Sequence, residues 1–194
     1  MKLYTDVGGQ APSPRRVRIF IAEKGLEVAL EEMKLHEQNR TDAFRKKNRF
    51  RSLPVLELDD GTCIAESMAI CRYLEELTPE PDLLGATPLE RAHIEMWTRR
   101  IELALYIPID MSGDFFPEEM ATLMRDGAHR TMRFLNRELS SRPYIAGTRY
   151  TMADIFAQGA LDFGIAHVGY ELPREHEALA RWHAQVSARP SALA

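Results

Sequence analysis

The sequence is poor in three features that would place it in a specialised class of protein. It has only two cysteines, Cys63 and Cys71, too few for a disulfide framework or a zinc site made of cysteines alone. Its longest apolar runs fall well short of the ~20 residues that a membrane span needs. Its 25 basic residues do not exceed its 29 acidic ones, and this net charge of −4 lacks the basic surplus typical of nucleic-acid binders.

Two further absences narrow the class. The N-terminus has no long apolar segment of the kind found in a secretory signal, and the histidines are scattered without a metal-ligand spacing. What is present is ordinary for a globular protein, with 45% apolar and 28% charged residues. We therefore expect a cytoplasmic protein with no metal, no nucleic-acid partner and no membrane association.

The chain divides near a segment rich in proline, acid and glycine. Residues 78–85 read Thr-Pro-Glu-Pro-Asp-Leu-Leu-Gly, which is typical of a linker. Residues before it mix strand-like and helix-like patterns, whereas residues after it are almost entirely helix-like. The sequence therefore predicts two domains, residues 1–80 and 86–194.

The first half predicts a βαβ unit followed by a hairpin and a helix. In Ala11-Pro12-Ser13-Pro14, Ser13 suits an N-cap and Pro14 the first helical position. Gly25 suits the helix end. Asp60-Gly61 predicts the hairpin turn. The expected strands are residues 2–5, 28–34, 54–58 and 62–65, and the expected helices are 14–25, 41–47 and 67–77, the last capped by Ser67.

The second half predicts an all-helical domain of about four helices. A capping box of Thr151 and Asp154 marks one helix start. The expected helices are residues 88–107, 118–139, 152–167 and 173–187.

This plan and its motifs resemble the glutathione transferase family, and in particular its bacterial theta- and nu-like members. The resemblance implies an α/β plus all-α fold: a thioredoxin-like N-terminal domain followed by an all-helical C-terminal domain. It rests on a set of motifs in a fixed order: Val17-Arg18-Ile19, Ala22-Glu23-Lys24-Gly25, Leu53-Pro54-Val55-Leu56, Asp60-Gly61, Glu66-Ser67-Met68-Ala69-Ile70, Tyr144-Ile145-Ala146-Gly147 and Thr151-Met152-Ala153-Asp154-Ile155.

The resemblance implies that glutathione is the co-substrate and that Glu66 and Ser67 hold its γ-glutamyl end. A helix N-terminus attracts anions through its free N–H groups and its dipole. Ser67 would bind the α-carboxylate, while Glu66 would pair with the α-ammonium group. On the residues alone, the alternative is that Ser67 only caps the helix and Glu66 is a solvated charge.

The resemblance also implies contacts to the rest of glutathione. Family members have a cis proline at the position of Pro54, and the backbone of Leu53 would pair with the cysteinyl backbone of glutathione. Arg45 stands nearest the basic residue that binds the glycine carboxylate. The family's usual glycine is replaced by Arg51, which removes a residue that adopts positive φ at low cost. The loop therefore departs from the family's pattern at this position.

The group that activates the thiol is less evident. Many theta-like members carry serine where this chain has Ala11, so that donor is missing. Some nu-like members have a donor two residues later, where this chain has Ser13. We predict Ser13 as the catalytic residue. The alternatives are that Tyr4 is the donor, or that Ser13 only caps the helix.

The resulting functional prediction is a detoxification enzyme that joins the glutathione thiolate to an apolar electrophile. The electrophile would bind between the domains, near Tyr106, Met111, Phe115 and Phe116. Two alternatives stay open: a glutathione-dependent disulfide or peroxide reductase, and a transferase-like protein that binds without catalysis. A homodimer is expected, and Phe50 is a candidate aromatic key that inserts into the neighbouring subunit.

Overall fold

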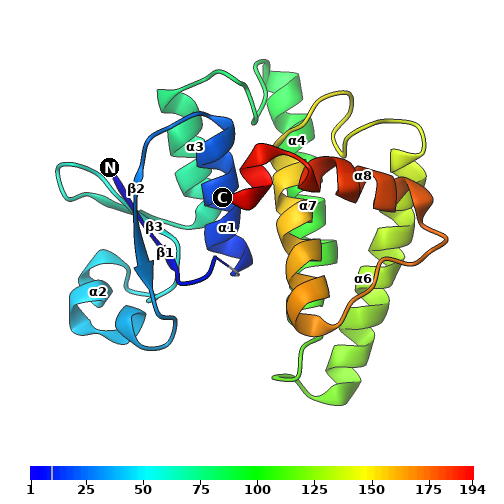
Figure 1. Ribbon diagram of the computed structural model, residues 1–194, viewed down its shortest axis with the longest axis horizontal. Helices are drawn as coiled ribbons and strands as arrows, with labels where there is room; N and C mark the ends of the chain where they lie inside the picture. Colours follow the sequence, from blue (N-terminus) through cyan, green and yellow to red (C-terminus); the bar gives the residue numbers. More distant parts are fainter. Residues whose placement is uncertain (10) are drawn as a thin grey trace. The chain divides into compact units, whose positions relative to one another are not determined.

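The computed structural model describes residues 1–9 and 11–194. By its internal contacts the chain forms two compact units, one of residues 1–81 with 193–194 and the other of residues 82–192. The first is a sheet with helices and the second is helical, so the predicted α/β plus all-α fold is confirmed (Figure 1).

The first unit contains a four-stranded sheet in the order β2-β1-β3-β4. Strand β1 is parallel to β2 and antiparallel to β3, and β3 pairs with β4 across the predicted hairpin. The strands are β1 (Lys2–Asp6), β2 (Ala29–Met33), β3 (Val55–Glu57) and β4 (Cys63–Ala65).

Helices cover both faces of this sheet, because successive buried side chains along its strands point to opposite faces. Leu3 and Leu56 are paired across β1 and β3 and are fully buried. Their neighbours Tyr4 and Val55 point to the opposite face, where Phe44 packs on Tyr4 edge to face at 5.8 Å. Figure 1 shows α1 and α3 together beside the sheet and α2 apart from them. The helices are α1 (Pro12–Glu23), α2 (Asp42–Lys47) and α3 (Ser67–Leu77), with a 3-10 turn η1 (Gln38–Arg40).

The second unit is a bundle around α7 (Met152–Phe163), which is buried along most of its length. Its buried residues lie on every side of the helix, so α7 forms the centre of the bundle. The other segments are α4 (Pro88–Ile101), the π-helical η2 (Glu102–Tyr106), α5 (Ile107–Asp110), α6 (Glu118–Leu139), the π-helical η3 (Gly164–Val168), α8 (Glu177–Ser187) and η4 (Pro190–Leu193).

The N-terminus of α7 is closed by a buried carboxylate. Asp154 accepts hydrogen bonds from the backbone N–H of Thr151 at 3.0 Å and of Ile145 at 2.9 Å, and from the indole of Trp182 at 2.8 Å. The predicted capping box is thus confirmed. Of the four helix starts predicted in this unit, one is wrong: the last helix starts at Glu177 rather than at Pro173.

Candidate functional site

Helix α1 begins at Pro12, two residues earlier than predicted. Its N-cap is Ala11, which has no side chain able to cap. Both Pro12 and Pro14 suit the first turn, and the sequence rule selected the wrong one. Ser13 is therefore the second helical residue, so its expected role as the N-cap is wrong.

Ser13 nevertheless holds the free donors of this first turn. The N–H of Ala11 donates to the Asp6 carboxylate at 2.7 Å, and the N–H of Arg15 donates to the carbonyl of Ala11 at 3.1 Å. Pro12 and Pro14 have no N–H. Within residues 1–9 and 11–194, neither the N–H nor the hydroxyl of Ser13 has a hydrogen-bond partner, so both are available to a ligand.

The loop before α1 is fixed by Arg18, which is buried. Its guanidinium pairs with Asp6 at 3.2 Å and donates to the hydroxyl of Thr5 at 2.5 Å and to the carbonyl of Gly9 at 2.6 Å. Arg18 therefore acts locally, because its charge is matched by Asp6.

The start of α3 has an unusual backbone. Glu66 is the N-cap, with a φ of 69° and no side-chain capping bond. Non-glycine residues at positive φ cost about 1–3 kcal/mol and cluster at functional sites. Its carboxylate is exposed, and no ion pair holds it among the described residues. An open carboxylate on a strained backbone is what an ammonium-binding residue would present.

Ser67 is the first residue of α3 and does not act as its cap. Its side chain is 7% exposed, and its hydroxyl oxygen accepts a hydrogen bond from Arg16 at 3.1 Å. The alternative in which Ser67 merely caps the helix therefore does not describe its geometry. Arg16 is itself 3% exposed, and nothing in the sequence pattern signalled its burial.

Leu53 and Pro54 lie directly before β3, joined by a cis peptide bond as the resemblance implied. Leu53 is buried with Tyr4, Phe44 and Val55. The structure thus places this dipeptide at the entry of a central strand of the sheet.

Arg45 lies on the exposed side of α2 and has no side-chain partner among the described residues. Its neighbour Lys47 is engaged instead, since it pairs with Glu57 at 2.6 Å. Glu57 also accepts the hydroxyl of Tyr4 at 2.5 Å, and burial raises the pKa of that phenol. Tyr4 is committed to this cluster, which removes the support for it as a thiol donor.

The loop after α2 keeps a left-handed residue without its glycine. Arg51 has a φ of 57°. Asn48 holds the turn, because its side chain donates to the carbonyl of Ser52 at 2.9 Å and accepts from the N–H of Phe50 at 3.0 Å. Asn39 donates to the carbonyl of Arg51 at 2.7 Å. Side-chain amides thus stabilise the conformation that the family's glycine would favour.

Neither cysteine offers a thiolate at neutral pH. Cys71 is fully buried in α3, and burial raises the pKa of its thiol well above the ordinary range. Cys63 is only partly buried, and burial raises the pKa of its thiol too. A reactive thiolate at this site has to come from a ligand.

The four residues predicted for the electrophile lie along η2, α5 and the following loop. Tyr106 is half-buried and packs on Phe156 at 5.9 Å, while Met111 and Phe116 are also half-buried. Phe115 is fully exposed.

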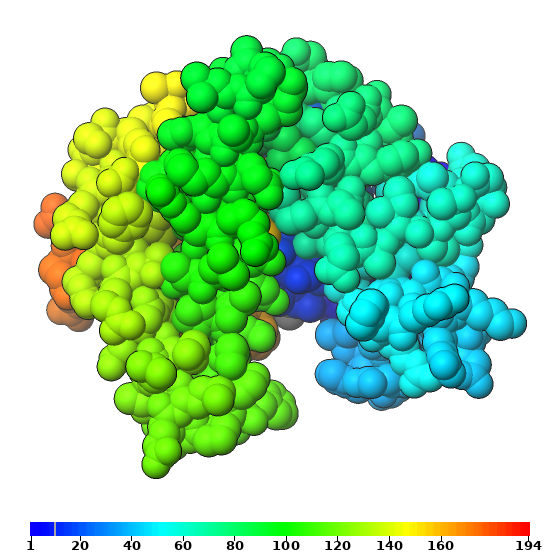
Figure 2. Space-filling model, turned by 180° about the vertical axis from the view of Figure 1, so that it is seen from behind, coloured from blue at the N-terminus to red at the C-terminus, as the bar shows by residue number. Residues whose placement is uncertain are grey.

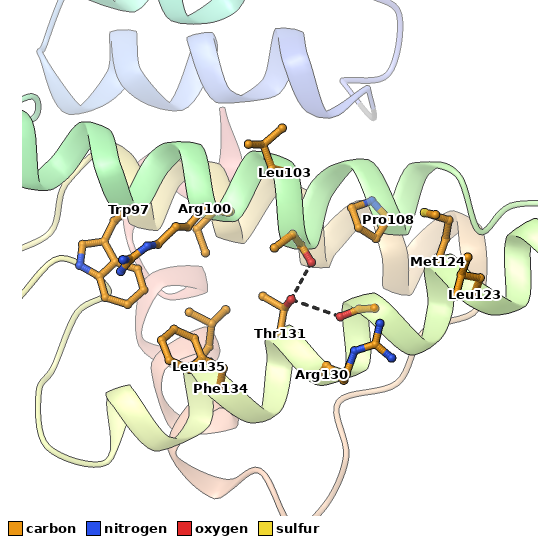
Figure 3. A pocket seen from close by; sticks show the side chains of 13 residues that line it. Trp97, Arg100, Leu103, Pro108, Leu123, Met124, Arg130, Thr131, Phe134 and Leu135 are labelled. Atoms are coloured by element: carbon orange, nitrogen blue, oxygen red, sulfur yellow. Dashed lines mark hydrogen bonds between the residues drawn. The ribbon is translucent and has the colours of Figure 1, made fainter.

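A different apolar cavity of about 640 Å³ lies between α4–η2 and α6, and none of these four residues lines it. Figure 3 shows Trp97 and Phe134 facing this space, and Figure 2 shows the surface where the green and yellow-green helices run side by side. Trp97 stacks on Phe134 at 5.9 Å.

No helix within residues 1–9 and 11–194 is long and apolar enough to cross a membrane. No group of three or more His, Cys, Asp or Glu side chains in the same residues is arranged to hold a metal ion.

Comparison with known proteins agrees with this geometry. The glutathione S-transferase N-terminal domain matches residues 11–77, and the C-terminal domain of the same family matches residues 99–190. Glutathione S-transferase 2 of Saccharomyces cerevisiae is 37% identical, covering 98% of this chain and 87% of the relative.

Solved structures are similar over the whole length. A glutathione S-transferase domain-containing protein of Marinobacter aquaeolei VT8 is 36% identical with a TM-score of 0.91, covering 98% of this chain and 99% of the other. A class Gtt2 glutathione S-transferase of Vibrio parahaemolyticus is 34% identical with a TM-score of 0.89, covering 98% and 94%. The chain belongs to the glutathione S-transferase family, which uses glutathione as co-substrate, and is an enzyme of that family.

Proposed function

We propose that this enzyme activates the thiol of glutathione and joins its sulfur to an apolar electrophile. The observation that carries the proposal is the start of α3, where the exposed Glu66 and the buried Ser67 stand side by side. They offer an anion and a cluster of donors to the ammonium and carboxylate of one γ-glutamyl group. Arg45 would bind the glycine carboxylate, and the backbone of Leu53 would pair with the cysteinyl unit.

The free donors of Ser13 support its assignment as the catalytic residue. A thiolate is stabilised when a hydrogen bond is donated to it, and α1 adds the positive end of its dipole. In the reaction the thiol loses its proton to solvent. The sulfur then forms a bond to the electrophilic carbon, and the leaving group departs with its electron pair. Tyr106, Met111, Phe115 and Phe116 would contact the apolar part of that substrate.

The binding test is the double variant Glu66→Ala with Ser67→Ala. Both ends of the γ-glutamyl zwitterion lose partners, and charge-assisted hydrogen bonds contribute about 1.5–3 kcal/mol each. Calorimetric titration with glutathione should therefore show a large loss of affinity. Unchanged affinity would refute this placement of the ligand.

The activation test compares two variants of Ser13. Ser13→Ala removes only the hydroxyl, whereas Ser13→Pro removes the hydroxyl and the N–H at a helix position that tolerates proline. The pKa of bound glutathione, followed by thiolate absorbance, should rise in the first variant and rise further in the second. An identical pKa in all three proteins would leave Ser13 without a catalytic role.

The reaction type is tested with three substrates: chlorodinitrobenzene, a hydroperoxide and a glutathione mixed disulfide. We expect turnover of the first. Turnover of only the second or third would establish a reductase, and binding of glutathione without any turnover would establish a binding protein. We place the activity in the cytoplasm, since both cysteines are free thiols and reducing compartments keep them so.

We also propose a homodimer in which Phe50 of one copy enters the α4–α6 groove of the other. Phe50 is 88% exposed on a loop fixed by Asn48, and the groove offers aromatic and aliphatic walls. Burying such an aromatic at an interface contributes roughly 2 kcal/mol or more. Sedimentation of Phe50→Ala at low concentration should show more monomer. The matched control is Phe115→Ala, because Phe115 is also exposed but lies elsewhere; equal behaviour of the two variants would argue against Phe50 as the contact.

A further inference from the structure

A buried arginine of α1 lies against the first residue of α3. The guanidinium of Arg16 donates to the hydroxyl oxygen of Ser67 at 3.1 Å, and the residue is 3% exposed. The same charge acts to lower the pKa of Cys71, one turn further along α3, against the larger effect of burial. Because arginine stays protonated in proteins, this places a permanent positive charge beneath the start of α3.

The hydrogen bond from Arg16 also determines what Ser67 can do. A serine hydroxyl has one hydrogen and two lone pairs. Arg16 occupies a lone pair, so the oxygen accepts in that direction and its own hydrogen is left to donate to another group. Ser67 can therefore donate its hydrogen to a ligand while it accepts from Arg16, next to the positive end of the α3 dipole.

We propose that Arg16 is a positioning residue for the α-carboxylate of the γ-glutamyl group: it orients the Ser67 hydroxyl toward that carboxylate and adds positive charge behind it. The inference rests on the proposed glutathione site at Glu66 and Ser67. Arg16 does not contact the ligand in this arrangement and acts through Ser67.

Two other buried cations lie on or directly after α1. Arg18 pairs with Asp6 at 3.2 Å, and Lys24, the C-cap of α1, pairs with Glu75 at 2.5 Å near the far end of α3. Lys24 is therefore the suitable control, because its removal takes a buried cation from the same helix pair without touching the start of α3.

The test compares two ligands that differ only in the carboxylate concerned. Glutathione carries the α-carboxylate, and 4-aminobutanoyl-cysteinylglycine lacks it. Calorimetry would measure the affinity of both for the wild type, Arg16→Met, Arg16→Lys and Lys24→Met, with thermal unfolding of each free protein as a check on folding.

We expect Arg16→Met to weaken glutathione roughly tenfold or more, as the loss of a charge-assisted hydrogen bond implies, while the decarboxylated ligand changes little. Arg16→Lys should recover part of the affinity for glutathione, because it returns the charge without the forked geometry. Lys24→Met should leave the ratio of the two affinities as it is in the wild type.

Equal weakening of both ligands in Arg16→Met would overturn the inference, because a purely structural residue does not distinguish them. If that variant does not fold, Arg16→Lys provides the same comparison with a smaller expected change. A wild type that binds both ligands equally would instead refute the proposed glutathione site itself, so the two failures can be told apart.

Discussion

The N-terminus of α7 and the N-terminus of α3 both bring donors together, but they differ in the source of the anion. At α7 the chain supplies its own carboxylate, and Asp154 accepts from Thr151, Ile145 and Trp182. At α3 the N-cap Glu66 makes no capping bond and has a strained backbone, while Ser67 accepts a hydrogen bond from the buried Arg16. The chain itself completes the start of α7, whereas we propose that the start of α3 binds an anion of the ligand.

The largest effect should come from removing the internal anion. Asp154→Ala leaves the N–H groups of Ile145 and Thr151 and the indole of Trp182 without their buried acceptor. Breaking such a network costs about 3–5 kcal/mol, which chemical denaturation of the two proteins would measure. Asp126→Ala on α6, at an exposed position, is the control and should change stability little. A small loss at position 154 would mean that α7 does not depend on this carboxylate.

The same carboxylate should make stability depend on pH. Burial raises the pKa of Asp154 to about 6, against 3.8 for a free carboxyl, in spite of its hydrogen-bond donors. The native state holds this proton more tightly than the unfolded chain does. The stability that this tighter proton binding gives the folded state is therefore fully present below about pH 4. It is lost as pH rises through about 6, and the change in unfolding free energy is about 3 kcal/mol.

Asp154→Asn does not titrate and serves as the reference for this effect. The stability of the wild type minus that of the variant should fall across the interval and stay level above about pH 7. A difference that is constant with pH would show that the hydrogen bonds offset the effect of burial on this group.

At α3 we expect a gain of stability when Glu66, the proposed ammonium-binding residue, is replaced by glycine. Glu66→Gly relieves the positive φ of 69° and should raise the unfolding free energy by about 1 kcal/mol. Glu66→Ala keeps the strain and should not. Both variants lose the carboxylate and should weaken glutathione to the same extent. Equal stability of the glycine and alanine variants would mean that the backbone at this position is not strained.

The smallest effect is expected in the loop after α2. Arg51 has a φ of 57°, and its contact with Asp42 at 3.8 Å is exposed and weak. Arg51→Gly should raise the unfolding free energy by at most about 1 kcal/mol, which would appear as a slightly higher melting temperature. Arg49→Gly, two residues earlier and not at positive φ, should lower stability instead. The reverse order of the two melting temperatures would contradict this reading of the loop.

The two helix starts were not equally accessible from sequence. The capping box of Thr151 and Asp154 is a local pattern, so its spacing alone predicted the start of α7. At α3 the pattern indicated a helix with Ser67 as its cap, yet the cap is Glu66. A glutamate carries no sequence signal for positive φ, unlike glycine or asparagine. Only the family resemblance directed attention to both residues.

The buried arginines show a second limit of sequence reasoning. Arginine is mostly exposed in proteins, and no sequence pattern predicts that Arg16 and Arg18 are buried. Their burial depends on Ser67 and Asp6, which only the folded chain brings near them. Long periodic segments were easier, and the expected helix over 118–139 matches α6 at both ends. Local patterns thus give elements, whereas the contacts that tune a site arise from tertiary structure.

The most direct test of the central claim is a crystal structure of the enzyme with glutathione bound. The account predicts the γ-glutamyl carboxylate at the N–H and hydroxyl of Ser67, the ammonium group at Glu66, and the sulfur within hydrogen-bond distance of Ser13. Glutathione bound with its γ-glutamyl carboxylate away from the start of α3 would contradict it.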